Sequence, residues 1–430
     1  MQNTCGCPNF DKEMSLQSAA VLSIMSSFVP PMKDKSSGIA ILLAFALIPL
    51  SGFATDIYIP SLPAMAGELK ASSVNIQLTL SLFLISYGAS QLFVGSFLDS
   101  FGRYKPGLVS LVIFAVASIV IATTTNLYLI YFMRVIHGFT VGIVIVAKRA
   151  YFVDLFTDDK LKHYLSLFSI IWSAGPIVAP FIGGYLQKAF GWQSSFYFLG
   201  CLALIMAVLE YIFSGETLVH PTPFQIKKIL NIYKTMISTA TFSLGIIMLG
   251  LAYGMVMIYN MTGPFIIEHS LHLSPVVAGY SSLILGLAWM TGGFIGKATI
   301  NRPFYKRLVV NLGLQATFVA CMIISVSFIS NLYSLVFFAF LIHVSTGFTF
   351  NNYFTFCLGK FPKNAGIAGG LTGGMAYVII SFLSYAVVNF IPAKDERNLS
   401  YSYLVFVVIS ILIMFTIYQF RKKERQAVTA

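Results

Sequence analysis

The stretch IAILLAFALIPLSGFATDIYIPSLP, residues 39–63, decides the fold class of this chain. It opens as an apolar run, and about 20 such residues in a helix cross the ~30 Å hydrocarbon core of a membrane. One acid, Asp56, lies near the far end of the run. A carboxylate in hydrocarbon is costly unless it faces protein or water, so an acid in such a span indicates a functional site. The stretch therefore predicts a membrane helix that carries a functional acid.

Similar apolar segments fill most of the 430 residues. Charged residues make up 10% of the chain and hydrophobic residues 57%, the reverse of what a soluble domain needs at its surface. The expected fold is an all-α membrane protein, with twelve transmembrane helices in two six-helix bundles and both termini cytoplasmic. The expected spans are residues 39–60, 74–98, 107–125, 127–153, 164–189, 194–214, 238–267, 275–297, 308–330, 332–357, 365–391 and 400–420.

The longest connection between spans, GETLVHPTPFQIKKILNIYKTMI, is polar and basic and divides the spans into two equal sets. Equal halves are typical of transporters built from an internal repeat. Tyr58 and Pro60 in the first span match Tyr259 and Pro264 in the seventh, which supports a repeat. The expected organisation is a cytoplasmic tail at 1–37, a bundle at 38–214, a cytoplasmic linker at 215–237, a second bundle at 238–420 and a tail at 421–430.

The net charge of +12 is explained by membrane topology. Most of the 27 Lys and Arg residues fall on tails, loops or helix ends that are assigned to the cytoplasm when the first span runs outward. This is the positive-inside rule, so the charge gives no support for a nucleic-acid partner. The exceptions are Lys70, Lys188, Lys394 and Arg397 outside, and Arg134 within a span.

Motifs of ATP-driven pumps, enzymes and metal sites are absent from the sequence. There is no G-x-x-x-x-G-K-[ST], H-E-x-x-H or G-x-S-x-G, which are the patterns of phosphate binding, zinc peptidases and serine hydrolases. Cys5 and Cys7 form a C-G-C pair, but two thiols alone cannot complete a tetrahedral metal site. The chain is therefore expected to be no enzyme and to use no metal or cofactor.

The loop after the second span, GSFLDSFGRYKPG at residues 95–107, carries the first family signature. Its Asp99 and Arg103 can pair at the membrane surface. The loop resembles the G-x-L-x-D-R-x-G-R-K of the major facilitator superfamily, although Ser100 stands where the family has Arg. This resemblance implies a conformational gating role for Gly95, Asp99, Gly102 and Arg103.

Three further motifs resemble one branch of that superfamily, the bicyclomycin-resistance (Bcr/CflA) branch of drug:proton antiporters. TDIYIPSLPAM, residues 55–65, is similar to its D-x-Y-x-P-x-x-P. RVIHGFTVG, residues 134–142, is similar to its R-x-x-Q-G, with His137 in the Gln position. GPIVAPFIGG, residues 175–184, looks like the antiporter signature of span five. That signature implies gating roles for Gly175, Pro176, Pro180, Gly183 and Gly184.

Asp56 and Arg134 are expected to lie at one level of the membrane. Arg134 follows the outer end of the fourth span by about seven residues, or ~10 Å of helix, and Asp56 precedes Pro60 at the outer end of the first span by four. Pairing would reduce the cost that each charge carries alone in hydrocarbon. We therefore expect a proton-coupling pair, and the alternative is two side chains that reach the outer interface independently.

Candidate substrate contacts come from the spans that line the cavity in the resembled fold. Aromatic, Met and amide side chains suit loosely specified apolar ligands, although an aromatic side chain in a membrane helix more often packs or faces lipid. The candidates are Tyr58, Gln91, Tyr253, Met257, Tyr259, Asn260, Phe348 and Asn352.

The resemblance implies a proton-coupled secondary transporter that exports small, largely apolar molecules by alternating access. Its expected partners are a small-molecule substrate, protons and the lipid bilayer, and it is expected to act as a monomer in the inner membrane. Two alternatives remain open at this point. One is a dedicated carrier for a single metabolite or siderophore, and the other is a transporter-like receptor that binds without transporting.

Overall fold

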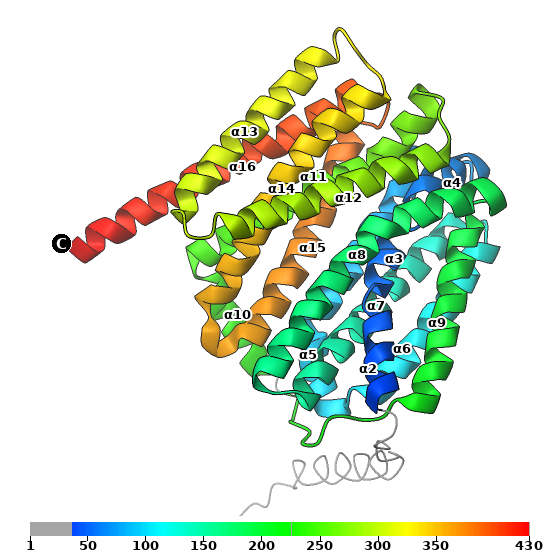
Figure 1. The fold of residues 1–430 in the computed structure, drawn as a ribbon, viewed down its shortest axis with the longest axis vertical. Coiled ribbons are helices and arrows are strands. Elements are labelled where there is room, and N and C mark those ends of the chain that lie inside the picture. Colours follow the sequence, from blue (N-terminus) through cyan, green and yellow to red (C-terminus); the bar gives the residue numbers. More distant parts are fainter. Residues whose placement is uncertain (1–36, 225, 430) are drawn as a thin grey trace, which may run out of the picture.

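The computed structural model describes residues 37–224 and 226–429, and these residues form helices and connecting loops (Figure 1). Twelve of the helical segments are long and apolar enough to cross a membrane, which confirms the predicted number. The predicted N-terminal tail lies outside the described residues except for Ser37. At the other end, the last helix continues through the predicted C-terminal tail to Thr429.

The helices follow one another with short connections. The first half contains α2 (Ser37–Leu47), α3 (Leu50–Asp56), η2 (Ile59–Ser61), α4 (Leu62–Glu68), α5 (Ser73–Phe101), α6 (Tyr104–Thr123), α7 (Leu127–Leu155), α8 (Asp158–Phe190) and α9 (Gln193–Phe213). After α10 (Ile226–Ile237), the second half contains α11 (Ala240–Phe265), η3 (Ile266–Ser270), α12 (Pro275–Ala298), α13 (Phe304–Ser325), α14 (Leu332–Lys360), η4 (Pro362–Asn364), α15 (Ala365–Phe390) and α16 (Glu396–Thr429).

The first span is broken into pieces and is longer than predicted. It runs from Gly38 to Glu68, beyond the expected end at residue 60, and contains α2, α3, η2 and α4 in succession. Pro49 separates α2 from α3, and Pro60 lies in η2. A proline cannot donate the backbone hydrogen bond that a continuing helix requires. The breaks therefore leave carbonyl oxygens near Asp56 without their usual helical donors.

The two halves meet along two helix pairs that each combine one helix from either half. One pair is α5 with α15, where a Cβ added to Gly88 would lie 2.6 Å from the carbonyl oxygen of Gly374. The other pair is α8 with α12, where a Cβ added to Gly184 would lie 2.8 Å from the carbonyl oxygen of Pro275. Glycine at these positions lets the helix backbones approach closely, as is common in membrane bundles.

Figure 1 shows how α8 and α12 diverge from their contact region. The contacts involve the last part of α8, from Ile177 to Gly184, and the first part of α12, from Pro275 to Gly286. The first part of α8 is largely exposed, and its buried residues concentrate in its second half. The ends of the two halves that carry these contacts are called the outer ends, because the predicted topology places them outside. They are in contact across this pair, while the opposite ends of these two helices separate.

Large apolar side chains cover the outward faces of the spans. Val116 on α6 is 53% exposed and Phe294 on α12 is 63% exposed. In water, a continuous apolar surface of this extent would drive association, whereas the hydrocarbon of a bilayer solvates it. The protein is therefore a multi-pass membrane protein with the lipid bilayer as its surroundings.

Candidate functional site

Asp56 is buried where the two halves of the protein meet. It is the last residue of α3, and 1% of its surface is exposed. The side-chain nitrogen of Asn260, on α11 in the other half, donates to Oδ1 of Asp56 at 3.2 Å. Oδ2 is also buried and has no hydrogen-bond partner among the described residues. One oxygen of the acid is therefore held across the two halves, and the other makes no hydrogen bond to a described residue.

A second hydrogen bond crosses the two halves beside the first. The side-chain nitrogen of Gln77 on α5 donates to the backbone oxygen of Met261 at 2.6 Å. Because Met261 follows Asn260, two consecutive residues of α11 bind two different helices of the first half. These amide bonds connect the outer ends of the halves at the depth of Asp56.

The two bonded residues, Asp56 and Asn260, each stand near a proline of their own half. Asp56 lies four residues before Pro60, and Asn260 lies four residues before Pro264. Each proline removes the helical donor for the carbonyl oxygen four residues earlier. Counted from these prolines, Asp56 and Asn260 occupy corresponding positions in the two halves, and the structure joins them by a hydrogen bond. This register differs from the one that matches Tyr58 with Tyr259.

Arg134 is fully buried on α7, but the expected ion pair with Asp56 is not formed. Asp56 bonds Asn260, whereas the nitrogens of Arg134 bond backbone oxygens, Tyr58 and His137. Ion pairs that the structure does show include Arg103 with Asp99 and with Asp154, Lys148 with Glu210, and Lys162 with Asp159. The two residues therefore make no direct ion pair, and their predicted role as a proton-coupling pair stays a prediction. The alternative was wrong, because neither side chain reaches an exposed interface.

Neutral groups surround the guanidinium of Arg134 in place of a carboxylate. Its nitrogens donate to the backbone oxygens of Ala54 at 2.9 Å and Thr79 at 3.4 Å, and to the hydroxyl of Tyr58 at 3.2 Å. Its central carbon lies 4.5 Å from the ring centre of Tyr58 and 4.4 Å from that of Phe83. The carbonyl of Ala54 is available because α3 ends two residues later. Because arginine stays protonated in proteins, Arg134 is a buried cation that binds these groups and makes no hydrogen bond to Asp56.

His137, which occupies the Gln position of the resembled motif, completes this arrangement. Its Nδ1 lies 3.4 Å from a guanidinium nitrogen of Arg134, and its Nε2 lies 3.0 Å from the hydroxyl of Ser118. An arginine can only donate, so Nδ1 accepts. Ser118 uses its own proton on the backbone oxygen of Phe114 at 2.9 Å, so Nε2 donates and His137 is neutral. His137 and Ser118 were absent from the predicted site, since nothing in their spacing indicates this contact.

The predicted gating residues of span five pack on the first span. A Cβ added to Gly175 would lie 2.9 Å from the backbone oxygen of Pro49, and one added to Gly183 would overlap the backbone of Ile57. Gly184 lies against α12 in the other half, as described above. Pro176 and Pro180 lie within α8. This face of α8 therefore contacts the helical breaks on both sides of Asp56.

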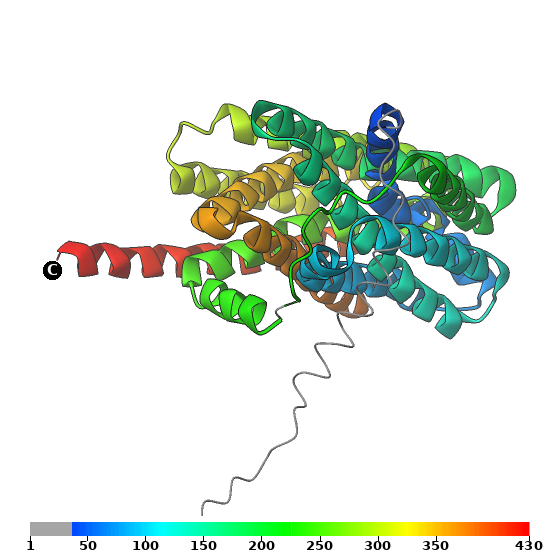
Figure 2. The same cartoon turned by 90° about the horizontal axis from the view of Figure 1, so that it is seen from below.

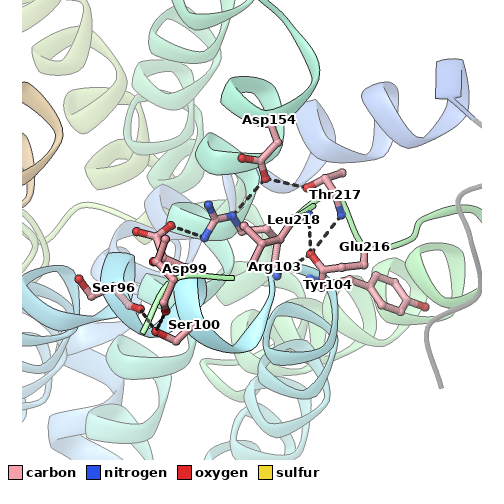
Figure 3. A network of polar contacts seen from close by, with 10 residues as sticks. Ser96, Asp99, Ser100, Arg103, Tyr104, Asp154, Glu216, Thr217 and Leu218 are labelled. Carbon is pink, nitrogen blue, oxygen red and sulfur yellow. Dashed lines mark hydrogen bonds and ion pairs between the residues drawn. The ribbon is translucent and has the colours of Figure 1, made fainter. Parts of the chain in front are cut away.

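A second polar cluster lies at the opposite end of the first half, after the second span (Figure 3). Arg103 forms the expected pair with Asp99 at 2.6 Å and a further pair with Asp154 of α7 at 3.2 Å. Burial acts to lower the pKa of Arg103, but the hydrogen bonds and charges of Asp154 and Asp99 outweigh it and raise that pKa. Gly102 has a φ of +94°, which favours glycine.

The segment between the two halves is attached to this cluster. The carboxylate of Glu216 accepts from the backbone nitrogens of Arg103 at 2.9 Å and Tyr104 at 3.1 Å. These nitrogens open α6, and an acid at a helix N-terminus is stabilising. The backbone nitrogen of Thr222 donates to the backbone oxygen of Asp99 at 2.9 Å. Asp154 and Glu216 were missed at the sequence level, because only the fold brings them to the loop.

The profile of the Major Facilitator Superfamily matches residues 44–385, which is more than half of the chain. The chain belongs to the major facilitator superfamily. Multidrug resistance protein D of Escherichia coli (strain K12) is 27% identical over 356 residues, covering 80% of this chain and 87% of that relative. An MFS-type transporter of Bacillus subtilis (strain 168), YdgK, is 28% identical over 361 residues, covering 82% and 89%.

Further similarities support the fold of this facilitator. The bicyclomycin resistance protein homolog of Haemophilus influenzae is 33% identical over 200 residues, covering 46% of this chain and 50% of that relative. The nucleoside transporter NupG aligns with a TM-score of 0.68 at 14% identity, covering 88% of this chain and 98% of that structure. A D-xylose–proton symporter aligns with a TM-score of 0.66 at 14% identity, covering 88% and 97%. The expected all-α facilitator fold is thereby confirmed.

The predicted substrate contacts of this facilitator are distributed over several packing environments. Tyr58, Met257 and Tyr259 are fully buried. The ring of Tyr253 lies 5.4 Å from that of Trp289. The amide of Asn352 donates to the backbone oxygen of Phe348, four residues earlier on the same helix.

Two predicted residues on α5 differ in their surroundings. The amide of Gln91 lies against Gly373 of α15, so Gln91 is at the contact between the halves. A Cβ added to Gly95 would meet no atom within 4 Å among the described residues. Close packing thus gives no reason for glycine at position 95.

Proposed function

We propose that this facilitator is a proton-coupled exporter of small, largely apolar molecules in the inner membrane, acting as a monomer by alternating access. The proposal rests on one observation above all: Asp56 is buried, Oδ1 is bound across the two halves and Oδ2 is unbound. Such an acid can exchange a proton without losing the hydrogen bond that holds it. The names of two relatives, a multidrug resistance protein and a bicyclomycin resistance homolog, support the direction and the substrate class.

Proton binding at Asp56 would favour the arrangement in which the outer ends are in contact. Burying an ionised carboxylate with a single hydrogen bond to one oxygen is costly. A proton on Oδ2 removes this charge and lowers that cost. Loss of the proton restores the charge and favours opening of the outer ends, where water can solvate the carboxylate. The protonation state of one acid therefore biases the two states of the carrier.

Antiport follows if proton and substrate are alternative loads. The protonated carrier and the substrate-loaded carrier can each change between the two open states, while the empty, ionised carrier is held back. A proton entering down the membrane potential supplies ~2.3 kcal/mol per 100 mV, enough to export a neutral solute against a concentration ratio of tens. Arg134 would keep a fixed positive charge near Asp56, because its own contacts are neutral.

The proposal is tested by pairing a deletion strain with a strain that overexpresses the chain and growing both on a panel of toxic compounds. An exporter makes the deletion strain more sensitive and the overexpressing strain more resistant to several unrelated apolar compounds. The compound with the largest effect is then used with the purified chain in vesicles, where an imposed pH gradient should drive its accumulation. Protection against one compound alone would favour a dedicated carrier. Unchanged growth on the whole panel would overturn the proposal, and so would a selected compound that does not accumulate in response to the pH gradient.

A further inference from the structure

The helix α10 lies at the surface of the membrane. It connects α9 to α11, which both span the membrane, so the 12-residue helix between them must lie near the interface. Figure 2 shows the helices seen from below, with α10 at the edge of the bundle. It packs against α11 and α15. An interfacial helix can present one face to protein, one to lipid and one to water.

The protein-facing side of α10 is clearly defined. Ile229, Tyr233 and Met236 are buried. The hydroxyl of Tyr233 donates to the backbone oxygen of Leu92 on α5 at 2.6 Å. Burial raises the pKa of Tyr233 to about 12, so this hydroxyl keeps its proton. The hydrogen bond therefore fixes the rotation of α10 about its axis.

A second side of α10 is apolar and yet exposed. Ile226 is 43% exposed, and Leu230 and Ile237 are each 48% exposed. These residues are spaced by four and by seven, so they lie on one face of the helix at 3.6 residues per turn. That face is next to the buried one but is not covered by the described residues. Exposed aliphatic side chains at a membrane surface are stabilised when they enter the boundary between headgroups and acyl chains.

Lysines flank this apolar face. Lys227 and Lys234 are exposed and seven residues apart, so they lie one above the other along the helix. The sequence of α10 also contains Lys228 and has no acid. By contrast, the start of α8 combines Lys160 and Lys162 with acids. Positive charge beside an apolar face is complementary to the anionic headgroups of a lipid leaflet.

We propose that α10 is a binding surface for anionic lipids, with Ile226, Leu230 and Ile237 in the acyl boundary and Lys227 and Lys234 at the headgroups. Tyr233 connects this surface to α5, one of the helices at the contact between the halves. The lipid partner is defined by a negative headgroup and an acyl chain. The surface is separate from Asp56, and the proposal does not depend on what the chain transports.

The test uses the full chain with its native cysteines replaced and a bimane label at Leu230→Cys. The labelled protein is placed in phosphatidylcholine vesicles that contain an equal mole fraction of nitroxide-labelled phosphatidylglycerol or nitroxide-labelled phosphatidylcholine. Both lipids should quench the label, and phosphatidylglycerol should quench about threefold more strongly, since surface lysines attract anionic lipid. Added salt should reduce this preference. A label at Asn231→Cys, on the water-facing side, should be quenched little by either lipid.

Two charge-matched variants separate specific binding from net charge. Lys227→Gln with Lys234→Gln should abolish the preference for phosphatidylglycerol and retain quenching by phosphatidylcholine. Lys160→Gln with Lys162→Gln, which removes the same charge elsewhere, should retain the preference. Absence of quenching at Leu230→Cys would show that this face does not enter the bilayer. Equal quenching by the two lipids, or a preference that survives in the first variant, would also overturn the proposal.

Discussion

Charged residues are arranged in opposite ways at the two ends of the first half. In the loop after the second span, Arg103 touches Asp99 and Asp154 directly. In the hydrocarbon region, Arg134 touches backbone oxygens and a tyrosine hydroxyl, and Asp56 touches an asparagine. Both regions contain opposite charges near each other, but only the first forms ion pairs.

The difference fits a structural role for the paired acids and the switching role proposed for Asp56. An acid in a direct ion pair loses its partner when it is protonated, so protonation there opposes the folded arrangement. An acid held by a neutral amide can gain or lose a proton while its hydrogen-bond partner stays in place. The paired acids therefore suit the attachment of the linker, whereas Asp56 suits reversible proton binding.

Neutralising one acid of each region is expected to give the largest contrast. Asp56→Asn should reduce accumulation driven by a pH gradient by more than about tenfold, because the residue can no longer exchange a proton. Downhill exchange should persist, because an asparagine can still bond Asn260. The measurement is the steady-state accumulation of the selected compound in vesicles. Asp99→Asn is the matched comparison, which should reach its accumulation a few-fold more slowly but should not lose the response to the pH gradient. If Asp56→Asn still accumulated the compound under an imposed pH gradient, Asp56 would not be the proton-binding group, and the contrast between the two regions would fail.

Replacing Arg134 tests whether its neutral contacts hold the first half together. Arg134→Ala should lower the free energy of unfolding by about 1–3 kcal/mol, since buried acceptors at Ala54, Thr79 and Tyr58 lose their donor. Arg134→Lys should be intermediate, because a lysine keeps the charge but cannot reproduce the planar set of donors. Thermal unfolding in detergent measures both variants. Equal stability of the wild type and Arg134→Ala would contradict the proposed role of these contacts.

Removing the amide that bridges the halves should loosen the outer contact. Asn260→Ala should increase labelling of Ser61→Cys by an impermeant maleimide several-fold, because Ser61 is fully buried while the outer ends are in contact. Asn352→Ala is the control, since its amide bonds only within its own helix. Both variants are made in a background without native cysteines. If Ser61→Cys is labelled equally in Asn260→Ala and Asn352→Ala, the hydrogen bond of Asn260 does not hold the outer ends together.

Changes in the surface cluster should have the smallest effects. Asp154 contacts both Arg103 and the hydroxyl of Thr217, whereas the Asp99 side chain is 48% exposed. Exposed ion pairs are worth about 0.2–1 kcal/mol. Asp99→Asn should therefore slow transport by a few-fold with binding intact, and Asp154→Asn should slow it more. Transport rate and equilibrium binding are measured on the same preparations. If Asp99→Asn slowed transport more than Asp154→Asn, the exposure of an acid would not determine how much it contributes to this cluster.

The fold class followed from the sequence because hydrocarbon imposes strict rules on it. Apolar runs of membrane length, the distribution of Lys and Arg, and the loop at residues 95–107 predicted the twelve spans and the family. The pair Asp99–Arg103 could also be predicted, since both residues belong to one short loop. Asp56 and Arg134 could be singled out because isolated charges in apolar spans are rare.

The contacts of those charges were decided by tertiary structure alone. The sequence indicates how deep a residue lies in the membrane. It does not fix the rotation of each helix about its axis, or the path of the chain where a span is broken. The break after Asp56 exposes the carbonyl of Ala54 to Arg134, and the approach of α11 brings Asn260 to Asp56. Residues at one depth can therefore be held apart, because a buried charge binds whichever donor or acceptor the neighbouring helices bring within reach.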